Sequence, residues 1–241
     1  MRDKTIIIKI GGKILEDPED LNSTISQLKQ LLDKKSIQKI IIIPGGGSYA
    51  NFVRLIDQKL NIGNDLAHWM AIYAMHHNGY LLSEKYSFIK PFEGFKELEL
   101  SKELFSIFLP FNYLYQFDEL PHSWDVTSDS ITLYFAHKLE LKECYFIKDV
   151  DGIINKENLV LREITAKGYK NLKKTNKLLD LQEVGGSMKK SQPIDSYSID
   201  LIQNYKISCI LLNGKAEKNT ILNYFNKSEN KHSIYTKINF N

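Results

Sequence analysis

Thr5-Ile-Ile-Ile-Lys-Ile-Gly-Gly12 is an almost uninterrupted apolar run that contains one lysine and ends in two glycines. Such a run is typical of a buried strand. Because a charge without a partner is costly inside a strand, we expect Lys9 at the strand's carboxyl end, facing the crevice where open α/β sheets bind ligands. The glycines after it let backbone N–H groups approach an anion closely.

A second strand of the same kind follows at Lys39-Ile-Ile-Ile-Ile-Pro-Gly-Gly-Gly47. Two strands that each end in a glycine cluster predict a phosphate-handling site, and the alternative is a pair of ordinary tight turns. Gly45 to Ala50 also fits the loose dinucleotide pattern GxGxxG/A. The region where such a unit needs an acidic residue at a strand end leads instead into a helix, which counts against a dinucleotide oxidoreductase.

Length and composition predict one α/β domain over residues 1–241, with approximate lobes 1–140 and 141–241. The formal charge of +3 is too small and too evenly spread to favour nucleic acid or a membrane surface as a partner. No apolar run approaches the ~20 residues that span a bilayer, and no leader precedes the first strand, so we expect a cytoplasmic protein. Cys144 and Cys209 are expected to be reduced core residues.

Apolar runs alternate with segments of helical periodicity along most of the chain. Strands are expected near 5–10, 40–43, 105–109, 144–147 and 208–212, and helices near 17–32, 48–60, 65–83, 128–141 and 217–225. This order predicts an α/β fold, a three-layer αβα sandwich with a mainly parallel central sheet. The polar stretch 167–190 is expected to be a loop or lid.

Three further segments carry side chains suited to phosphate chemistry. In Trp124-Asp-Val-Thr-Ser-Asp-Ser130, Ser128 is expected to cap a helix, with Asp129 in its first turn. Asp129 either belongs to plain capping or holds two lysines that would otherwise repel each other. Lys148-Asp-Val-Asp-Gly152 is either a β-turn or a nucleotide-contacting turn, and Gly185-Gly-Ser-Met-Lys-Lys190 alone would be only a flexible basic loop.

In this order, the five motifs resemble those of the amino acid kinase family, which includes acetylglutamate, aspartate, UMP and isopentenyl phosphate kinases. The resemblance covers nearly the whole chain. The segments His68-Trp-Met-Ala-Ile72 and Leu120 to Ser130 are similar to the branch of [5-(aminomethyl)furan-3-yl]methyl phosphate kinases of methanofuran biosynthesis. The resemblance implies the amino acid kinase-like fold.

It also implies ATP-dependent phosphoryl transfer to a small molecule, with Mg²⁺ arriving on the nucleotide, and a homodimer. By this resemblance Lys9 and Lys190 neutralise charge on the transferred group, and Asp129 orients both. The residues it implies for holding the acceptor and the γ-phosphate are Gly11, Gly12, Gly45, Gly46, Gly47 and His68. Those it implies beside the nucleotide are Lys148, Asp149, Asp151, Gly152 and Lys189.

Some positions depart from the family pattern. Lys13 stands where relatives often carry a small hydroxyl residue, and Lys148 stands where a threonine is common. Ser187 and Met188 interrupt the usual Gly-Gly-Met, so either Lys189 or Lys190 is the second catalytic lysine. We favour Lys190 because it keeps the four-residue spacing from Gly186.

The function expected is transfer of the ATP γ-phosphate to a phosphate monoester. One alternative is a kinase that forms an acyl phosphate on a carboxylate, and another is a binding module that has lost its chemistry. His68 is either a contact of the acceptor or a packed residue. No resident metal is expected, because His76-His77 lacks the i, i+4 spacing of a helical metal site and is read as surface.

Overall fold

The computed structural model describes residues 4–180, 192–226 and 234–241. In this part of the chain eight strands form one sheet in the order β3-β4-β2-β1-β5-β7-β8-β6. All neighbouring strands are parallel except β7 and β8. The strands are β1 (Thr5–Ile10), β2 (Lys39–Pro44), β3 (Lys90–Phe92), β4 (Phe105–Phe108), β5 (Glu143–Lys148), β6 (Glu163–Thr165), β7 (Ser208–Asn213) and β8 (Tyr235–Asn239).

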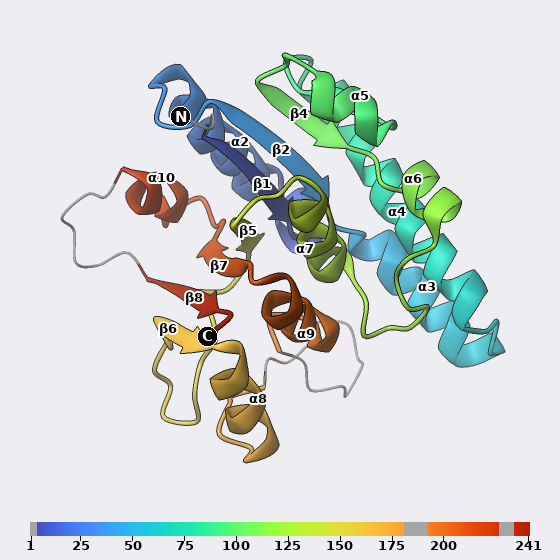
Figure 1. Ribbon diagram of the computed structural model, residues 1–241, viewed down its shortest axis with the longest axis vertical. Helices are drawn as coiled ribbons and strands as arrows, with labels where there is room; N and C mark the ends of the chain where they lie inside the picture. The colour runs from blue at the N-terminus through green and yellow to red at the C-terminus, as the bar shows by residue number, and fades with distance from the viewer. Residues whose placement is uncertain (1–3, 181–191, 227–233) are drawn as a thin grey trace.

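Helices cover both faces of this sheet (Figure 1). They are α1 (Gly12–Glu16), α2 (Pro18–Asp33), α3 (Gly47–Leu60), α4 (Asn64–Lys85), α5 (Phe95–Leu100), α6 (Phe111–Phe117), α7 (Ser128–Lys138), α8 (Ala166–Lys174), α9 (Ser196–Tyr205) and α10 (Thr220–Phe225). The expected α/β class, with a mainly parallel sheet between two helical layers, is confirmed.

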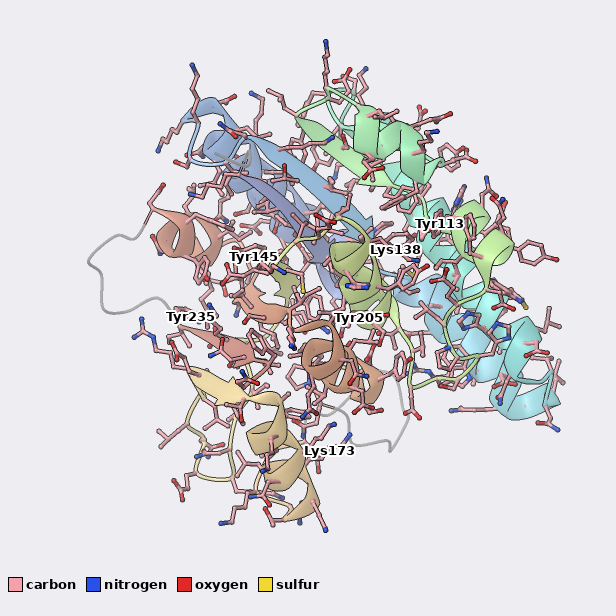
Figure 2. The ribbon with its side chains drawn as sticks, in the orientation of Figure 1. Tyr113, Lys138, Tyr145, Lys173, Tyr205 and Tyr235 are labelled. Carbon is pink, nitrogen blue, oxygen red and sulfur yellow. The ribbon has the colours of Figure 1, made fainter. Side chains whose placement is uncertain are left out.

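The alternation of side chains along the central strands produces two cores. In β1 the even-numbered isoleucines belong to a buried cluster with α2 and α10, whereas Ile7 belongs to a cluster with α7 and α9. On the first face Tyr145 of β5, which is labelled in Figure 2, packs against Phe225 of α10; their ring centroids are 4.9 Å apart. On the second face Tyr205 of α9, also labelled in Figure 2, stacks on His137 of α7, with ring centroids 4.0 Å apart.

Two helix starts show how the sequence directs the chain. Asp17 caps α2 as its sequence predicts, because its carboxylate accepts hydrogen bonds from the backbone N–H groups of Glu19 and Asp20, both at 3.0 Å. The expected cap of α7 is wrong by one residue. Thr127 is extended and its hydroxyl accepts from the Asp129 N–H at 3.3 Å, whereas Ser128 already lies in the helix.

The expectation of a loop over 167–190 is wrong for its first part. Residues Ala166–Lys174 form α8, which Thr165 caps by accepting a hydrogen bond from the Gly168 N–H at 2.9 Å. This helix buries Tyr169 against the sheet side and turns its lysines outward, so a polar composition concealed an amphipathic helix. Residues 181–191 lie outside the described part of the chain.

The sheet runs without a break across the expected lobe boundary near residue 140, because β1 pairs directly with β5. Residues before and after position 140 therefore contribute strands to one sheet, β1 to β4 before it and β5 to β8 after it. Among the described helices, none has both the length and the apolar content needed to cross a bilayer.

Candidate active site

Two lysines from neighbouring strands share one buried carboxylate at the carboxyl end of the sheet. The ammonium group of Lys9 lies 3.0 Å from Oδ1 of Asp129, and that of Lys148 lies 2.6 Å from Oδ2. The side chains are almost enclosed, at 8% exposure for Lys9, 14% for Lys148 and 3% for Asp129. Each carboxylate oxygen therefore faces its own cation.

Strand geometry brings these groups together. Lys9 pairs with Phe146 across β1 and β5, so Lys148 lies two residues further along β5 and on the same face of the sheet. That face is covered by α7, whose first turn carries Asp129. Gly11 follows β1, and a Cβ built on it would lie 3.7 Å from the Lys9 ammonium and 3.8 Å from the Cα of Lys148. Those two distances are ordinary contacts, whereas the same Cβ would lie only 3.0 Å from the Ile147 carbonyl oxygen, so it is the backbone of β5 that Gly11 approaches closely.

Burial and mutual repulsion alter the proton affinities of this cluster. The pKa of Lys9 is lowered to about 8, because the effect of burial, together with the charge of Lys148, outweighs the opposing effect of the Asp129 carboxylate. Burial by itself raises the pKa of Asp129, but the ammonium groups of Lys148 and Lys9 hold that pKa below its ordinary value. Asp129 is therefore ionised. Binding of an anion beside Lys9 would stabilise the protonated form of that lysine.

Lys9, Asp129 and Lys148 are called the triad below. Both glycine clusters lie near it, and the backbones of the two clusters touch. The N–H of Gly45 donates to the Ile10 carbonyl at 2.9 Å, and the side chain of Asn78 donates to the Gly45 carbonyl at 2.8 Å. A Cβ on Gly12 would overlap the Cα of Gly47, and Gly47 itself has a φ of +55°. Only residues without side chains allow this approach.

The start of α3 is occupied by an acidic side chain, Glu16, from the end of α1. The Glu16 carboxylate accepts hydrogen bonds from the backbone N–H and, at 2.9 Å, from the hydroxyl of Ser48. A helix N-terminus favours negative charge, so the chain itself places an anion at this point.

A cavity of about 270 Å³ opens from the glycine clusters towards α3, α4 and the segment before α7. Its inner end is lined by Gly12, Gly45 and Gly47, and its outer end by His68 and Trp124. Apolar walls come from Ala71, Ile72, Met75, Val126 and Ile131. The cavity therefore combines glycine backbone at one part of its wall with aromatic and apolar side chains at another, and Ser128, which also lines it, is the neighbour of Asp129.

His68 lies in this cavity as a neutral imidazole. Burial lowers its pKa to about 4, and the neighbouring His122 adds to that effect. The two rings stack with centroids 4.2 Å apart. Burial works against a charge on His122, but hydrogen bonds at 2.7 Å to Asp65 and Asp118 raise its pKa overall. His122, held by Asp65 and Asp118, therefore fixes the orientation of the His68 ring by stacking on it.

The outer end of the cavity also contains a guanidinium group. Arg54 of α3 lies over the ring of Trp124, 4.6 Å from its centroid. The indole N–H of Trp124 donates to Asp57 at 2.8 Å, which fixes the ring. No sequence pattern predicts Arg54 as a site residue, since it lines the cavity together with Ser123, Trp124 and Val126 only in the folded chain.

The Asp-Val-Asp-Gly turn follows β5 directly, as expected. Asp149 forms an ion pair with Lys13 at 2.9 Å, and Asp151 accepts from Asn213 at 2.7 Å and lies 3.7 Å from Lys218. Gly152 has a φ of +141°, which residues with a side chain rarely adopt. The turn begins at Asp149, the residue directly after Lys148, and therefore lies beside the triad.

Asp195, which no sequence pattern predicts as a site residue, holds the first turn of α7 in place. Its carboxylate accepts from the backbone and hydroxyl of Thr127 at 3.0 and 2.7 Å, and of Ser130 at 3.1 and 2.7 Å. It also caps α9 by accepting from the Ser198 N–H at 2.7 Å. These bonds fix the first turn of α7, which carries Asp129.

Most of the expected site residues therefore converge on one end of the sheet. Lys189 and Lys190 lie outside the described residues, and the second lysine found on Asp129 is Lys148. The alternation of side chains along β5 is the sequence signal for Lys148. Phe146 pairs with Lys9, and Lys148, two residues later, faces the same side of the sheet. The surface assignment of His76 is wrong: it is 6% exposed and packs between Tyr73 and Tyr80. In the described ranges no three His, Cys, Asp or Glu side chains gather as metal ligands.

Known proteins resemble this chain throughout its length. Residues 4–90 match the amino acid kinase family. The chain is 35% identical over 236 residues to the [5-(aminomethyl)furan-3-yl]methyl phosphate kinase of Methanocaldococcus jannaschii, with 96% of each chain covered. It is 23% identical to an acetylglutamate kinase of Campylobacter hominis, with 92% of this chain and 76% of that one covered. The crystal structure of UMP kinase from Ureaplasma parvum superposes with a TM-score of 0.66 at 20% identity, covering 99% and 100% of the two chains.

Proposed function

The chain belongs to the amino acid kinase family and is a phosphotransferase, and on this basis we propose that it transfers the γ-phosphoryl group of ATP to a phosphate monoester. The observation that carries the proposal is the buried Lys9–Asp129 pair, because Ser128, the neighbour of Asp129, lines the same cavity as Gly12 and Gly45 of the two glycine clusters. The similarity to a kinase whose named acceptor is a furanylmethyl phosphate supports an acceptor of that class.

In the proposed reaction an oxygen of the acceptor phosphate attacks the γ-phosphorus of ATP. The bond between that phosphorus and the bridging oxygen to the β-phosphate breaks, so the products are ADP and a diphosphate. This chemistry needs positioning and charge neutralisation rather than a covalent enzyme intermediate. Lys9 supplies positive charge beside the glycine N–H groups, and Asp129 holds its ammonium in place.

The acceptor is proposed to lie in the cavity between the glycine clusters and Trp124. Its phosphate would contact backbone N–H groups of Gly12, Gly46 and Gly47, and its organic part would pack on the apolar walls. His68 would contribute a neutral hydrogen-bonding ring rather than a cation, since burial keeps its pKa near 4. Arg54 would supply the positive charge at the outer end.

The nucleotide is proposed to lie beyond the triad, beside Asp149, Asp151 and Gly152, in the lobe 141–241. The residues of the site fit a Mg²⁺ ion that arrives on ATP: both oxygens of Asp129 face ammonium groups, and the described residues hold no ligand cluster. When bound, such an ion neutralises phosphate charge and is held mainly by phosphate and water oxygens.

Steady-state assays with Mg·ATP and a panel of phosphate monoesters, including furanylmethyl phosphates, test the proposal. ADP formation together with a phosphorus NMR signal of a diphosphate is the expected result. Turnover with a carboxylate, trapped by hydroxylamine as a hydroxamate, would instead identify an acyl phosphate kinase. ATP binding without turnover on any acceptor, unchanged in Lys9→Ala, would identify a binding module.

We also propose that the chain forms a homodimer through α3 and α4, which lie side by side (Figure 1). Large apolar side chains remain exposed on these helices: Tyr49, Phe52, Leu55, Leu60, Leu66, Tyr73 and Leu81. Burial of such a surface against a second copy would remove apolar area from water. Light scattering on Phe52→Glu, with Lys59→Glu on the same helix as control, tests this: only the first should dissociate.

A further inference from the structure

Lys148 contacts one oxygen of the Asp129 carboxylate, and Lys9 contacts the other. Its ammonium lies 2.6 Å from Oδ2 of Asp129, a shorter separation than the 3.0 Å between Lys9 and Oδ1. With one carboxylate oriented by two ammonium groups, rotation of the carboxylate about its own axis would break both contacts.

The charges in this cluster do not cancel. Two ammonium groups face one carboxylate inside a region that is almost closed to solvent, which leaves an excess positive charge where a phosphate would bind. Lys148 also ends β5, immediately before the turn proposed to face the nucleotide. It therefore connects the acceptor side of the centre to the nucleotide side.

We propose that Lys148 is a positioning residue for phosphoryl transfer, which holds Lys9 through their shared Asp129 carboxylate and keeps the centre positively charged. This inference rests on the proposed kinase function of the same site. The sequence predicts that Asp129 pairs Lys9 with Lys190 or Lys189, which lie outside the described residues, and Lys148 was expected only beside the nucleotide.

The proton affinity of Lys9 provides support from a second direction. In the part of the chain that the structure describes, the charged groups that act on Lys9 are Asp129 of α7 and Lys148 of β5. The positive charge of Lys148 lowers the pKa of Lys9, so removing that charge should raise it. If the charge of Lys148 did not act on Lys9, Lys148→Met would leave this pKa unchanged, and a purely structural role for Lys148 would leave kcat unaffected in a variant that folds.

The variants that separate these roles are Lys148→Met, which keeps the length of the stem, and Lys148→Arg, which keeps the charge. The matched control is Lys237→Met, because Lys237 also contacts β5 through a 2.6 Å ion pair, with Glu143, but lies outside the site. Circular dichroism and thermal melts report whether each variant folds.

Two measurements are made on each variant. The first is the Lys9 pKa, followed by NMR on protein labelled with ¹³C at lysine Cε, with the signal assigned by its loss in Lys9→Arg. The second is the pH dependence of kcat and kcat/KM. We expect Lys148→Met to raise the Lys9 pKa, to move the basic limb of kcat/KM upward from about 8 and to lower kcat by roughly 10²-fold. Lys148→Arg should keep the Lys9 pKa and kcat close to their wild-type values.

The inference is overturned if Lys148→Met leaves the Lys9 pKa unchanged, or if its kcat falls no further than that of Lys237→Met. Failure of the kinase proposal looks different. Wild-type protein would then show no turnover on any acceptor, while the NMR titration would still decide whether Lys148 controls Lys9.

Discussion

Gly12 and Gly47 come from different glycine clusters, yet their backbones lie so close that a Cβ on Gly12 would overlap the Cα of Gly47. The contact joins the loop after β1 to the start of α3 and forms the inner end of the cavity. Neither loop has a side chain that could yield, so the position tolerates no substitution without a backbone shift.

We expect Gly12→Ala to lower kcat/KM by at least about tenfold and to destabilise the fold by about 1–3 kcal/mol, because an added methyl group forces the two loops apart. Assays and thermal melts measure the two effects. Gly94→Ala is the control, since its Cβ would meet only the flexible side chain of Glu97, at 3.0 Å or more. Equal effects of the two substitutions would show that the close approach has no special role.

Lys9→Met is expected to lower kcat by about 10²–10³-fold, because one positive group at the transferred phosphoryl is lost. Lys39→Met is its control: Lys39 also belongs to a central strand, but its ammonium donates to the carbonyl oxygens of Leu98 and Ser101, at 3.0 and 2.8 Å, at the opposite end of the sheet. Steady-state kinetics on both variants decide the matter, and a comparable loss in Lys39→Met would remove Lys9 from the mechanism.

Asp129→Asn should destabilise the protein by about 3–5 kcal/mol near neutral pH, because two buried ammonium groups lose their counter-charge. The pKa of Asp129 is lower in the fold than in the unfolded chain, where it is about 3.9. Its ionised form therefore stabilises the fold above that unfolded value, and this contribution is lost as the pH falls through the folded pKa.

Urea unfolding at a series of pH values measures this effect. The difference in unfolding free energy between wild type and Asp129→Asn should shrink below about pH 4. A difference that stays constant from pH 8 to pH 3 would mean that the charge of Asp129 does not stabilise the fold.

Arg54→Ala should raise the KM for an anionic acceptor by roughly 10- to 100-fold and change kcat little, since a charge-assisted contact is worth about 1.5–3 kcal/mol. Lys59→Ala, also on α3 but outside the cavity lining, should leave KM unchanged. If Arg54→Ala lowered kcat and left KM intact, Arg54 would act on the reacting phosphates instead of on the outer part of the acceptor.

Local sequence determined much of this protein. The run from Thr5 to Gly12 was sufficient to predict a central parallel strand, because continuous apolar side chains are stable only where both faces of a strand are buried. Asp17 and Pro18 fixed the start of α2 through interactions within one helical turn. The glycine clusters after β1 and β2 were also evident, since their backbone requirements are local.

The tertiary structure alone decided which side chains meet. Lys148 and Asp129 are 19 residues apart in the chain and touch because α7 covers the face of the sheet on which Lys9 and Lys148 both project. Asp195 reaches Thr127 across 68 residues, and Arg54 meets Trp124 between α3 and the segment before α7. Sequence patterns report the period of one element, whereas such contacts depend on how two elements pack, and that is set by the whole core.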